Sequence, residues 1–312
     1  MTTTTDTQPS LPIICGPTAV GKTSVAIELA EYFGAEIISA DSRQVYRLMD
    51  VGTAKATAQE QGRVKHHLLD VVWPDQEFNA STFTQQAKAA FEQIQSQGKR
   101  PFLVGGTGLY IKALTEGLLQ APGADPKVRQ QLKDRAAIEG SAALHQELQG
   151  VDPECAAKLH PNDLIRVSRA LEVFHQTGKP LSLFQKEHAF GDSPYRTLKI
   201  GLTLERETLY TRIDRRAEMM FDSGLLDEAQ GLLDAGYSPE LKALKTIGYR
   251  QAFALLRDEM THQEAVEDLK RATRRYAKQQ LTWFRGDKSI IWVDSSADFV
   301  TIRTLIEQFY DV

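Results

Sequence analysis

The nine residues GPTAVGKTS, at positions 16–24, constrain the fold of this chain more than any other stretch. They fit the pattern G-x-x-x-x-G-K-[ST] at every position. An apolar, strand-like run (11–15) precedes them, and the helix-like SVAIELAEYFG follows. Between a strand and a helix, such a loop presents backbone N–H groups, a mobile lysine and a hydroxyl to an anion. We therefore predict a phosphate-binding loop made of Gly16, Pro17, Thr18, Ala19, Val20, Gly21, Lys22 and Thr23, in which the Thr23 hydroxyl binds Mg²⁺.

The composition narrows the class of protein. With 312 residues, 42% apolar and 25% charged, the chain is typical of soluble globular proteins and long enough for two packed units. No apolar run is long enough to span a bilayer, so we expect a cytoplasmic protein without a membrane partner. Residues 1–10 lack the features of a signal peptide and are expected to be a disordered tail. Cys15 and Cys155 lack metal-type spacing, and Cys15 is most simply a buried strand residue.

Alternating strand-like and helix-like segments predict the fold class. Strand character recurs near residues 11–16, 35–41, 66–72, 100–106, 197–204 and 289–294, with helical patterns between most of these segments. This order predicts an α/β fold: a P-loop core with a mostly parallel sheet flanked by helices. Residues 122–195 show helical patterns with few strand signals and are predicted to form an inserted helical domain. The core is then residues 11–121 and 196–312.

The segment ISADSRQVY places polar residues just past a predicted strand. Asp41 would face the same crevice as the phosphate loop, because ligands bind at the carboxyl ends of parallel strands. An aspartate here also suits a helix or turn cap. A carboxylate beside a polyphosphate repels it unless a metal or a proton-bearing substrate lies between them, so we interpret Asp41 as a base or a magnesium partner. Ser42, Arg43 and Gln44 suit hydrogen bonding to a nucleobase.

Two further strand ends carry weaker signals. VGGTGLY places Thr107 at a strand end and a helix N-terminus, where its hydroxyl could meet phosphates or an acceptor group. Asp70, in HHLLDVV, resembles a loose Walker-B carboxylate and carries less weight than Asp41.

Basic residues gather near the C-terminus although the net charge is −4. The run KRATRRYAKQQLTWFRGDK carries seven Lys or Arg against one acidic residue and has aromatic residues between them. Such a helix is typical of a nucleic-acid-binding surface. Upstream, Arg212 and Arg216 lie four residues apart, a spacing that suits either a clamp on a diphosphate or ion pairs with Glu218 and Asp222.

Seven motifs taken together resemble the tRNA dimethylallyltransferases, also called tRNA isopentenyltransferases, of the bacterial type. They are GPTAVGKT, ADSRQVY, GGTGLY, NDLIRVSRALEV, LYTRIDRRAEMM, IGYRQ and YAKQQLTWFR, in the family's order, from about residue 12 to about residue 294. The phosphate loop is common to many families, whereas the other six motifs in series are specific. The chain departs from the family pattern at Arg43, where an apolar residue is common, and at Gln279, where a basic one is frequent.

The resemblance implies an enzyme that moves the dimethylallyl group from dimethylallyl diphosphate to N6 of adenosine 37 in tRNAs reading codons that begin with U. It implies Asp41 as base, with Thr107 and Arg216 as further catalytic residues and Mg²⁺ as cofactor. The sequence does not give the oligomeric state, and a monomer is our expectation. The resemblance also implies that residues 122–195 clamp the tRNA anticodon stem-loop. The tRNA-binding residues that it implies are Asp41, Ser42, Arg43, Gln44, Ile165, Arg166, Val167, Ser168, Arg169, Lys245, Thr246, Gly248, Tyr249, Arg250, Lys278, Gln279, Trp283 and Arg285.

Three alternatives remain open on the sequence. A small-molecule kinase would use the loop for ATP but gives the basic helix no role. A nucleic-acid-binding ATPase switch would use the helix but no prenyl donor. A prenyltransferase acting on free adenine nucleotides would need neither the insertion nor the basic helix.

Overall fold

The computed structural model describes residues 8–119, 121–123, 125–188, 193–296 and 299–310. The chain forms two compact units, residues 1–115 with 194–312 and residues 116–193. The insertion was expected over 122–195. Most of the expected N-terminal tail lies outside the described residues, but Ser10 already belongs to a strand and pairs with Arg196.

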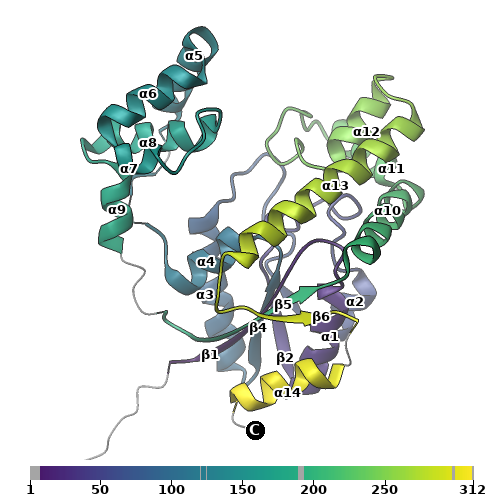
Figure 1. Ribbon diagram of the computed structural model, residues 1–312. Coiled ribbons are helices and arrows are strands. Elements are labelled where there is room, and N and C mark those ends of the chain that lie inside the picture. Colours follow the sequence, from purple (N-terminus) through teal and green to yellow (C-terminus); the bar gives the residue numbers. More distant parts are fainter. Residues whose placement is uncertain (1–7, 120, 124, 189–192, 297–298, 311–312) are drawn as a thin grey trace, which may run out of the picture. The chain divides into compact units, whose positions relative to one another are not determined.

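The first unit is built on a parallel sheet (Figure 1). Its six strands are β1 (Ser10–Cys15), β2 (Ala35–Ser39), β3 (His66–His67), β4 (Arg100–Gly105), β5 (Arg196–Thr203) and β6 (Ile291–Asp294), in the order β3-β2-β4-β1-β5-β6. Every pairing is parallel. The chain leaves β1 in one direction to reach β2 and later returns to its other side as β5. The carboxyl ends of β1, β2 and β4 therefore surround a crevice at a topological switch point.

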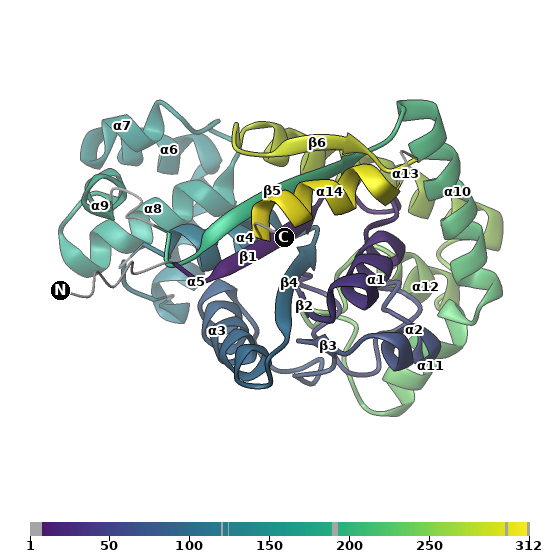
Figure 2. The same ribbon diagram turned by 90° about the horizontal axis from the view of Figure 1, so that it is seen from below.

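Helices cover both faces of this sheet (Figure 2). The helices of this unit are α1 (Lys22–Phe33), α2 (Ala58–Arg63), α3 (Ala80–Ser96), α4 (Gly108–Glu116), α10 (Arg206–Asp222), α11 (Leu225–Asp234), α12 (Tyr249–Leu256), α13 (His262–Arg285) and α14 (Phe299–Tyr310). Helices α1 and α14 pack on one face, and α3 and α4 pack on the other. No helix in the described ranges is long and apolar enough to cross a membrane.

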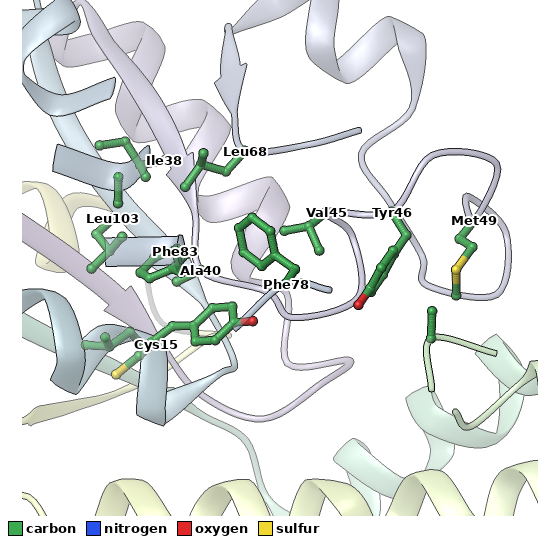
Figure 3. Packing of buried hydrophobic residues seen from close by; sticks show 14 of the residues in the cluster. Cys15, Ile38, Ala40, Val45, Tyr46, Met49, Leu68, Phe78, Phe83 and Leu103 are labelled. Atoms are coloured by element: carbon green, nitrogen blue, oxygen red, sulfur yellow. The ribbon is translucent and has the colours of Figure 1, made fainter. Parts of the chain in front are cut away.

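Alternation along the strands divides the core between the two faces. On β1, Ile13 and Cys15 pack on the side of α3 and α4, whereas Ile14 packs on the side of α1. Figure 3 shows Cys15 close to Phe83 and Leu103 in the first of these clusters. Burial raises the pKa of the Cys15 thiol to about 12, so this cysteine behaves as a core residue, as the sequence predicted.

Local signals set the ends of the long basic helix α13. Thr261 accepts a hydrogen bond from the Glu264 N–H, and the Glu264 carboxylate reaches back to the Thr261 N–H, which forms a capping box. At the other end, Asp287 pairs with Lys199 of β5 at 2.7 Å. The capping box thus sets the start of α13, and the Asp287–Lys199 pair ties the chain just past its end to the sheet.

The second unit (residues 116–193) is helical, as expected for the insertion. Its helices are α5 (Pro126–Glu139), α6 (Ser141–Val151), α7 (Pro153–Ala156), α8 (Leu164–Thr177) and α9 (Leu181–His188). Leu144, Leu148 and Leu171 lie at its centre. Within this unit the Glu172 carboxylate is fully buried, and it pairs with Arg129 at 3.0 Å and with Arg169 at 2.8 Å.

Two sequence predictions of elements need correction. The strand expected over 66–72 shortens to His66–His67, because Leu68 and Asp70 adopt positive φ values of 66° and 54° that break the extended chain. Helix α14 was not predicted. It covers the sheet face with Ile302 and Ile306, whose spacing of four is helical but gives a short signal.

The second unit allows a stability test that separates two arginines of α8. We expect Arg169→Met to lower the free energy of unfolding of this unit by about 3 kcal/mol, because Glu172 would keep its buried charge with fewer partners. Denaturant unfolding followed by circular dichroism measures the change. The matched control is Arg166→Met, whose partner Asp163 lies 3.6 Å away at the surface, and it should unfold like wild type. Equal unfolding of the two variants would contradict this role of Arg169.

Candidate active site

The phosphate loop lies between β1 and α1. Gly16 has φ 143°, and a Cβ there would come 2.6 Å from the Leu202 carbonyl oxygen, so only glycine lets the loop pass beside β5. Helix α1 begins at Lys22, directly after Gly21, which has φ 103°. The first N–H groups of α1 have no carbonyl partner within the helix. The loop therefore forms an anion site at a helix N-terminus, as the motif predicted.

The Lys22 ammonium group is held inside this loop. Its Nζ donates to the carbonyl oxygens of Gly16 at 3.1 Å and Pro17 at 2.8 Å. Burial lowers the pKa of Lys22 to about 8, an effect opposed by the nearby Asp41 carboxylate and reinforced by Arg216. A bound anion would remove this desolvation penalty, so Lys22 favours a negatively charged ligand.

Asp41 lies just beyond β2 and lines the same cavity as Lys22. One carboxylate oxygen, Oδ1, accepts from the backbone N–H groups of Arg43 at 2.8 Å and Gln44 at 3.3 Å. This is an Asx turn, so the capping interpretation holds for that oxygen. Among the described residues, Oδ2 has no hydrogen-bond partner. The turn thus fixes the carboxylate and leaves Oδ2 to accept a proton or a ligand.

Thr107 follows β4 and links this strand end to the Asp41 turn. Its Oγ1 accepts from the Ser42 N–H at 3.0 Å, and its own N–H donates to the Ala40 carbonyl oxygen at 3.1 Å. The ends of β2 and β4 are therefore cross-linked next to Asp41. The structure brings Thr107 and Asp41 together, as expected for two residues at neighbouring strand ends.

Helix α10 contributes Arg216 to the phosphate loop. The Arg216 Nη1 donates to Thr18 Oγ1 at 3.3 Å, and the side chain lines the cavity beside Lys22. Burial lowers the pKa of Arg216, although Asp41 raises it. The alternative ion pair with Glu218 does not form, because Glu218 pairs with Lys270. Arg212 contacts only the rim, through the Val20 carbonyl oxygen at 3.4 Å.

These groups share one cavity of about 610 Å³ in the first unit, a size typical of ligand sites. Its walls combine the loop and the strand ends with apolar side chains from α10, α13 and the segment before α12, including Ile213, Ala217, Met220, Ile247 and Leu269. The cavity therefore offers a cationic end for phosphates next to apolar surface.

The metal prediction rests on the loop itself. Within the described part of the chain, no group of three or more His, Cys, Asp or Glu side chains could hold a metal ion. Thr23 lines the cavity beside Lys22. A donor set of one hydroxyl fits a Mg²⁺ ion that takes most of its ligands from phosphate oxygens and water. Asp70 is not available as a Walker-B ligand, because it pairs with Lys55 at 2.6 Å.

The basic residues of α13 divide into two groups. In the first group, up to residue 274, Lys270 pairs with Glu218, Arg271 with Asp268 and Arg274 with Asp214. In the second group, the side chains are exposed and form no ion pair with any described residue; they are Arg275, Lys278 and Arg285. Gln279 lines the cavity, and Trp283 is 44% exposed. Within the described part of the chain, the basic side chains of α13 that are available to bind a polyanion therefore lie after residue 274.

Two of the predicted tRNA-binding residues in the first unit are wrong as surface contacts. Tyr249 is fully buried, and its hydroxyl donates to Glu228 at 2.6 Å. Gly248 is buried against the Gly52 carbonyl oxygen, with φ 95°. Both hold the segment before α12 against residues 50–54. Their neighbours Thr246 and Arg250 line the cavity, and Lys245 is exposed and pairs with Glu240.

In the Asp41 turn and in the second unit, some of the predicted tRNA-binding residues are likewise buried or bonded within the protein, whereas others are exposed. The Gln44 amide donates to the carbonyl oxygens of Thr53 and Ala54 and so supports the cavity wall, and Arg43 donates to the Lys242 carbonyl oxygen. On α8, Val167 is fully buried and cannot contact RNA, and Arg169 is engaged with Glu172. Ile165 and Arg166 are exposed, and Ser168 is half-buried.

Sequence reasoning missed two residues that organise the site. The Gln280 amide bonds the Thr18 N–H and the Gly106 carbonyl oxygen, and the Glu228 carboxylate accepts from three backbone N–H groups of residues 50–52. Gln280 lies four residues after the cavity-lining Tyr276, so helical spacing could have indicated it. Nothing in the sequence near Glu228 indicates its partners.

A phosphate loop, a strand-end carboxylate and a half-buried arginine around one cavity define a P-loop enzyme that transfers a group to or from a phosphorylated substrate. Residues 44–287 match the family model described as IPP transferase. The chain is 53% identical over 300 residues to the tRNA dimethylallyltransferase of Geobacter sulfurreducens, covering 96% of each sequence, and 52% identical to that of Geobacter metallireducens, covering 96% of this chain and 97% of the relative. The chain belongs to this family of tRNA prenyltransferases.

Solved structures agree with the assignment. The full-length tRNA isopentenylpyrophosphate transferase of Bacillus halodurans is 42% identical with a TM-score of 0.71, covering 97% of this chain and 95% of that one. A eukaryotic dimethylallyltransferase acting on tRNA is 29% identical with a TM-score of 0.78, covering 96% of this chain and 77% of that one. The P-loop α/β fold expected from the sequence is confirmed.

The lowered pKa of Lys22 predicts how anion binding depends on pH. A bound diphosphate stabilises the ammonium form, so above about pH 8 binding requires uptake of a proton and the affinity falls as the pH rises. Isothermal titration of inorganic diphosphate across this range measures the slope. In Lys22→Met we expect weaker binding and a shallower slope, because only the titration of diphosphate itself remains. Equal slopes in the two proteins would contradict a role for Lys22 in binding.

Proposed function

We propose that this enzyme transfers the dimethylallyl group from dimethylallyl diphosphate to N6 of adenosine 37 in tRNAs reading codons that begin with U. Its family membership supports the prenyl transfer to tRNA and does not favour the kinase alternative. One observation carries the proposal: the Asp41 carboxylate shares one cavity with the Lys22 and Arg216 cations, and its Oδ2 has no hydrogen-bond partner among the described residues.

On the donor side, the chain's own groups stabilise the leaving diphosphate. The allylic carbon becomes cationic as its bond to oxygen breaks, and negative charge builds up on the diphosphate. Lys22, Arg216 and the N–H groups at the start of α1 are placed to meet that charge. We propose that Mg²⁺, bound by Thr23 and the diphosphate, supplies further charge neutralisation when present. The apolar wall of the cavity suits the five-carbon group.

On the acceptor side, the adenine amine is a poor nucleophile, because its lone pair is delocalised into the ring. The Asp41 Oδ2 can accept a proton from this amine as the new C–N bond forms. The Asx turn and the Thr107 cross-link hold the carboxylate in place for that step. For N6 to reach Asp41, the base must leave the stack of the anticodon loop and enter the cavity.

We propose that the RNA backbone lies along the second half of α13, where Arg275, Lys278 and Arg285 are exposed without ion pairs to any described residue. Trp283 offers a stacking surface for a base. In the second unit, exposed Ile165 and Arg166 of α8 are the residues of that helix that suit the proposed clamp on the anticodon stem-loop.

The function is tested by the transfer of label from radiolabelled dimethylallyl diphosphate to unmodified tRNA with Mg²⁺. Labelled ATP is followed in parallel. Label on adenosine 37 without ATP turnover supports the proposal. ATP turnover without prenyl transfer would contradict it and favour a kinase or an ATPase switch.

Asp41 should affect the chemical step far more than binding. We expect Asp41→Asn to lower the transfer rate at saturating substrates by about a hundredfold or more, because the amide cannot accept the proton. The dissociation constant for tRNA should change little, since the asparagine oxygen can still form the Asx turn. Single-turnover kinetics and filter binding measure the two quantities. A transfer rate close to that of wild type would exclude Asp41 as the base.

A further inference from the structure

We infer that Gln280 is a positioning residue that sets the donor-binding loop and the acceptor-binding turn at a fixed separation. The inference deepens the proposed function and rests on it. Gln280 lies on α13 and is only 7% exposed, and both polar atoms of its amide are used. Oε1 accepts from the Thr18 N–H at 2.8 Å, and Nε2 donates to the Gly106 carbonyl oxygen at 2.9 Å.

The first hydrogen bond leads to the leaving group. Thr18 belongs to the phosphate loop, and its hydroxyl accepts from Arg216 at 3.3 Å. By holding the Thr18 backbone, Gln280 also fixes the position of the Thr18 hydroxyl, to which Arg216 donates. The position of the groups that would bind the diphosphate, the phosphate loop and Arg216, therefore depends on the Gln280 side-chain carbonyl.

The second hydrogen bond leads to the base. Gly106 directly precedes Thr107, whose Oγ1 accepts from the Ser42 N–H beside Asp41. The contact is close: a Cβ at Gly106 would lie 2.4 Å from Gln280 Nε2, so the glycine gives the amide its place. The position of the Asp41 turn therefore depends on the Gln280 NH₂ group.

The helix that carries Gln280 is itself fixed. Asp287 pairs with Lys199 of β5, and Arg274 pairs with Asp214 of α10 at 2.9 Å. Gln280 thus bridges two loops from a rigid element, and its amide is matched to them because it offers one acceptor and one donor. Glutamate would keep the acceptor and lose the donor, whereas methionine has similar length and offers neither.

Misalignment of the two loops should slow the reaction without abolishing either binding event. An error of about 1 Å in the reacting groups can cost about a hundredfold in rate. For Gln280→Met we expect a loss of about that size in the single-turnover rate at saturating donor and tRNA. The dissociation constants of the two substrates should each change by less than about fivefold, because the groups that contact them remain. Gln280→Glu should fall between Gln280→Met and wild type.

The experiment compares wild type, Gln280→Met, Gln280→Glu and the stability control Ile302→Val in the label-transfer assay. Ile302 lies on α14, is buried and does not line the cavity, so its variant loses stability without moving either loop. Rates are taken per folded molecule, below the melting temperature of each variant. A slow Gln280→Met with near-normal affinities, beside a control at the wild-type rate, supports the inference.

Two results would overturn it. If wild type and Gln280→Met transfer label at the same saturated rate, Gln280 has no positioning role although the proposed function stands. If Gln280→Met and Ile302→Val lose rate equally, the effect is general destabilisation. A wild type that transfers no label at all overturns the proposed function and this inference with it.

Discussion

The site depends on a partly desolvated positive charge at the carboxyl ends of parallel strands. Lys22 lies in a loop whose carbonyl oxygens accept its protons, and burial lowers its pKa to about 8. Arg216 adds a second partly desolvated cation, and the Asp41 carboxylate is near enough to influence the pKa of both. Two desolvated cations beside one carboxylate favour the arrival of an anion. A diphosphate supplies that charge, which connects the fold of the loop with the chemistry of its ligand.

The strand order brings the reacting groups into one place. Because β4 lies between β1 and β2, the phosphate loop, the Asp41 turn and Thr107 emerge at neighbouring strand ends. Short hydrogen bonds then join them: Thr107 to the Ser42 N–H, and Gln280 to Thr18 and to Gly106. The same helix that carries Gln280 exposes basic residues that form no ion pair within the described part of the chain. One element can therefore present charge to RNA and fix the geometry of the reaction.

Much of this could be predicted from the sequence, because some signals are local. The phosphate loop needs a strand, glycines and a helix start within about a dozen residues, and Asp41 is marked by its place after a strand. The buried state of Tyr249 and Gly248 could not be read in the same way. It depends on Glu228 and on residues 50–54, which are far away in sequence. The family motifs likewise group exposed Arg166 with buried Val167, because a helical motif contains both faces of its helix.

In the proposed reaction, the phosphate loop holds the donor diphosphate while Asp41 holds the acceptor amine. A crystal structure with an anticodon stem-loop and an unreactive thio analogue of dimethylallyl diphosphate tests it most directly. We expect the diphosphate to bind Lys22 and Arg216, and adenine N6 to lie about 3 Å from the Asp41 carboxylate. An adenine bound away from Asp41, or a diphosphate bound outside the loop, would contradict it.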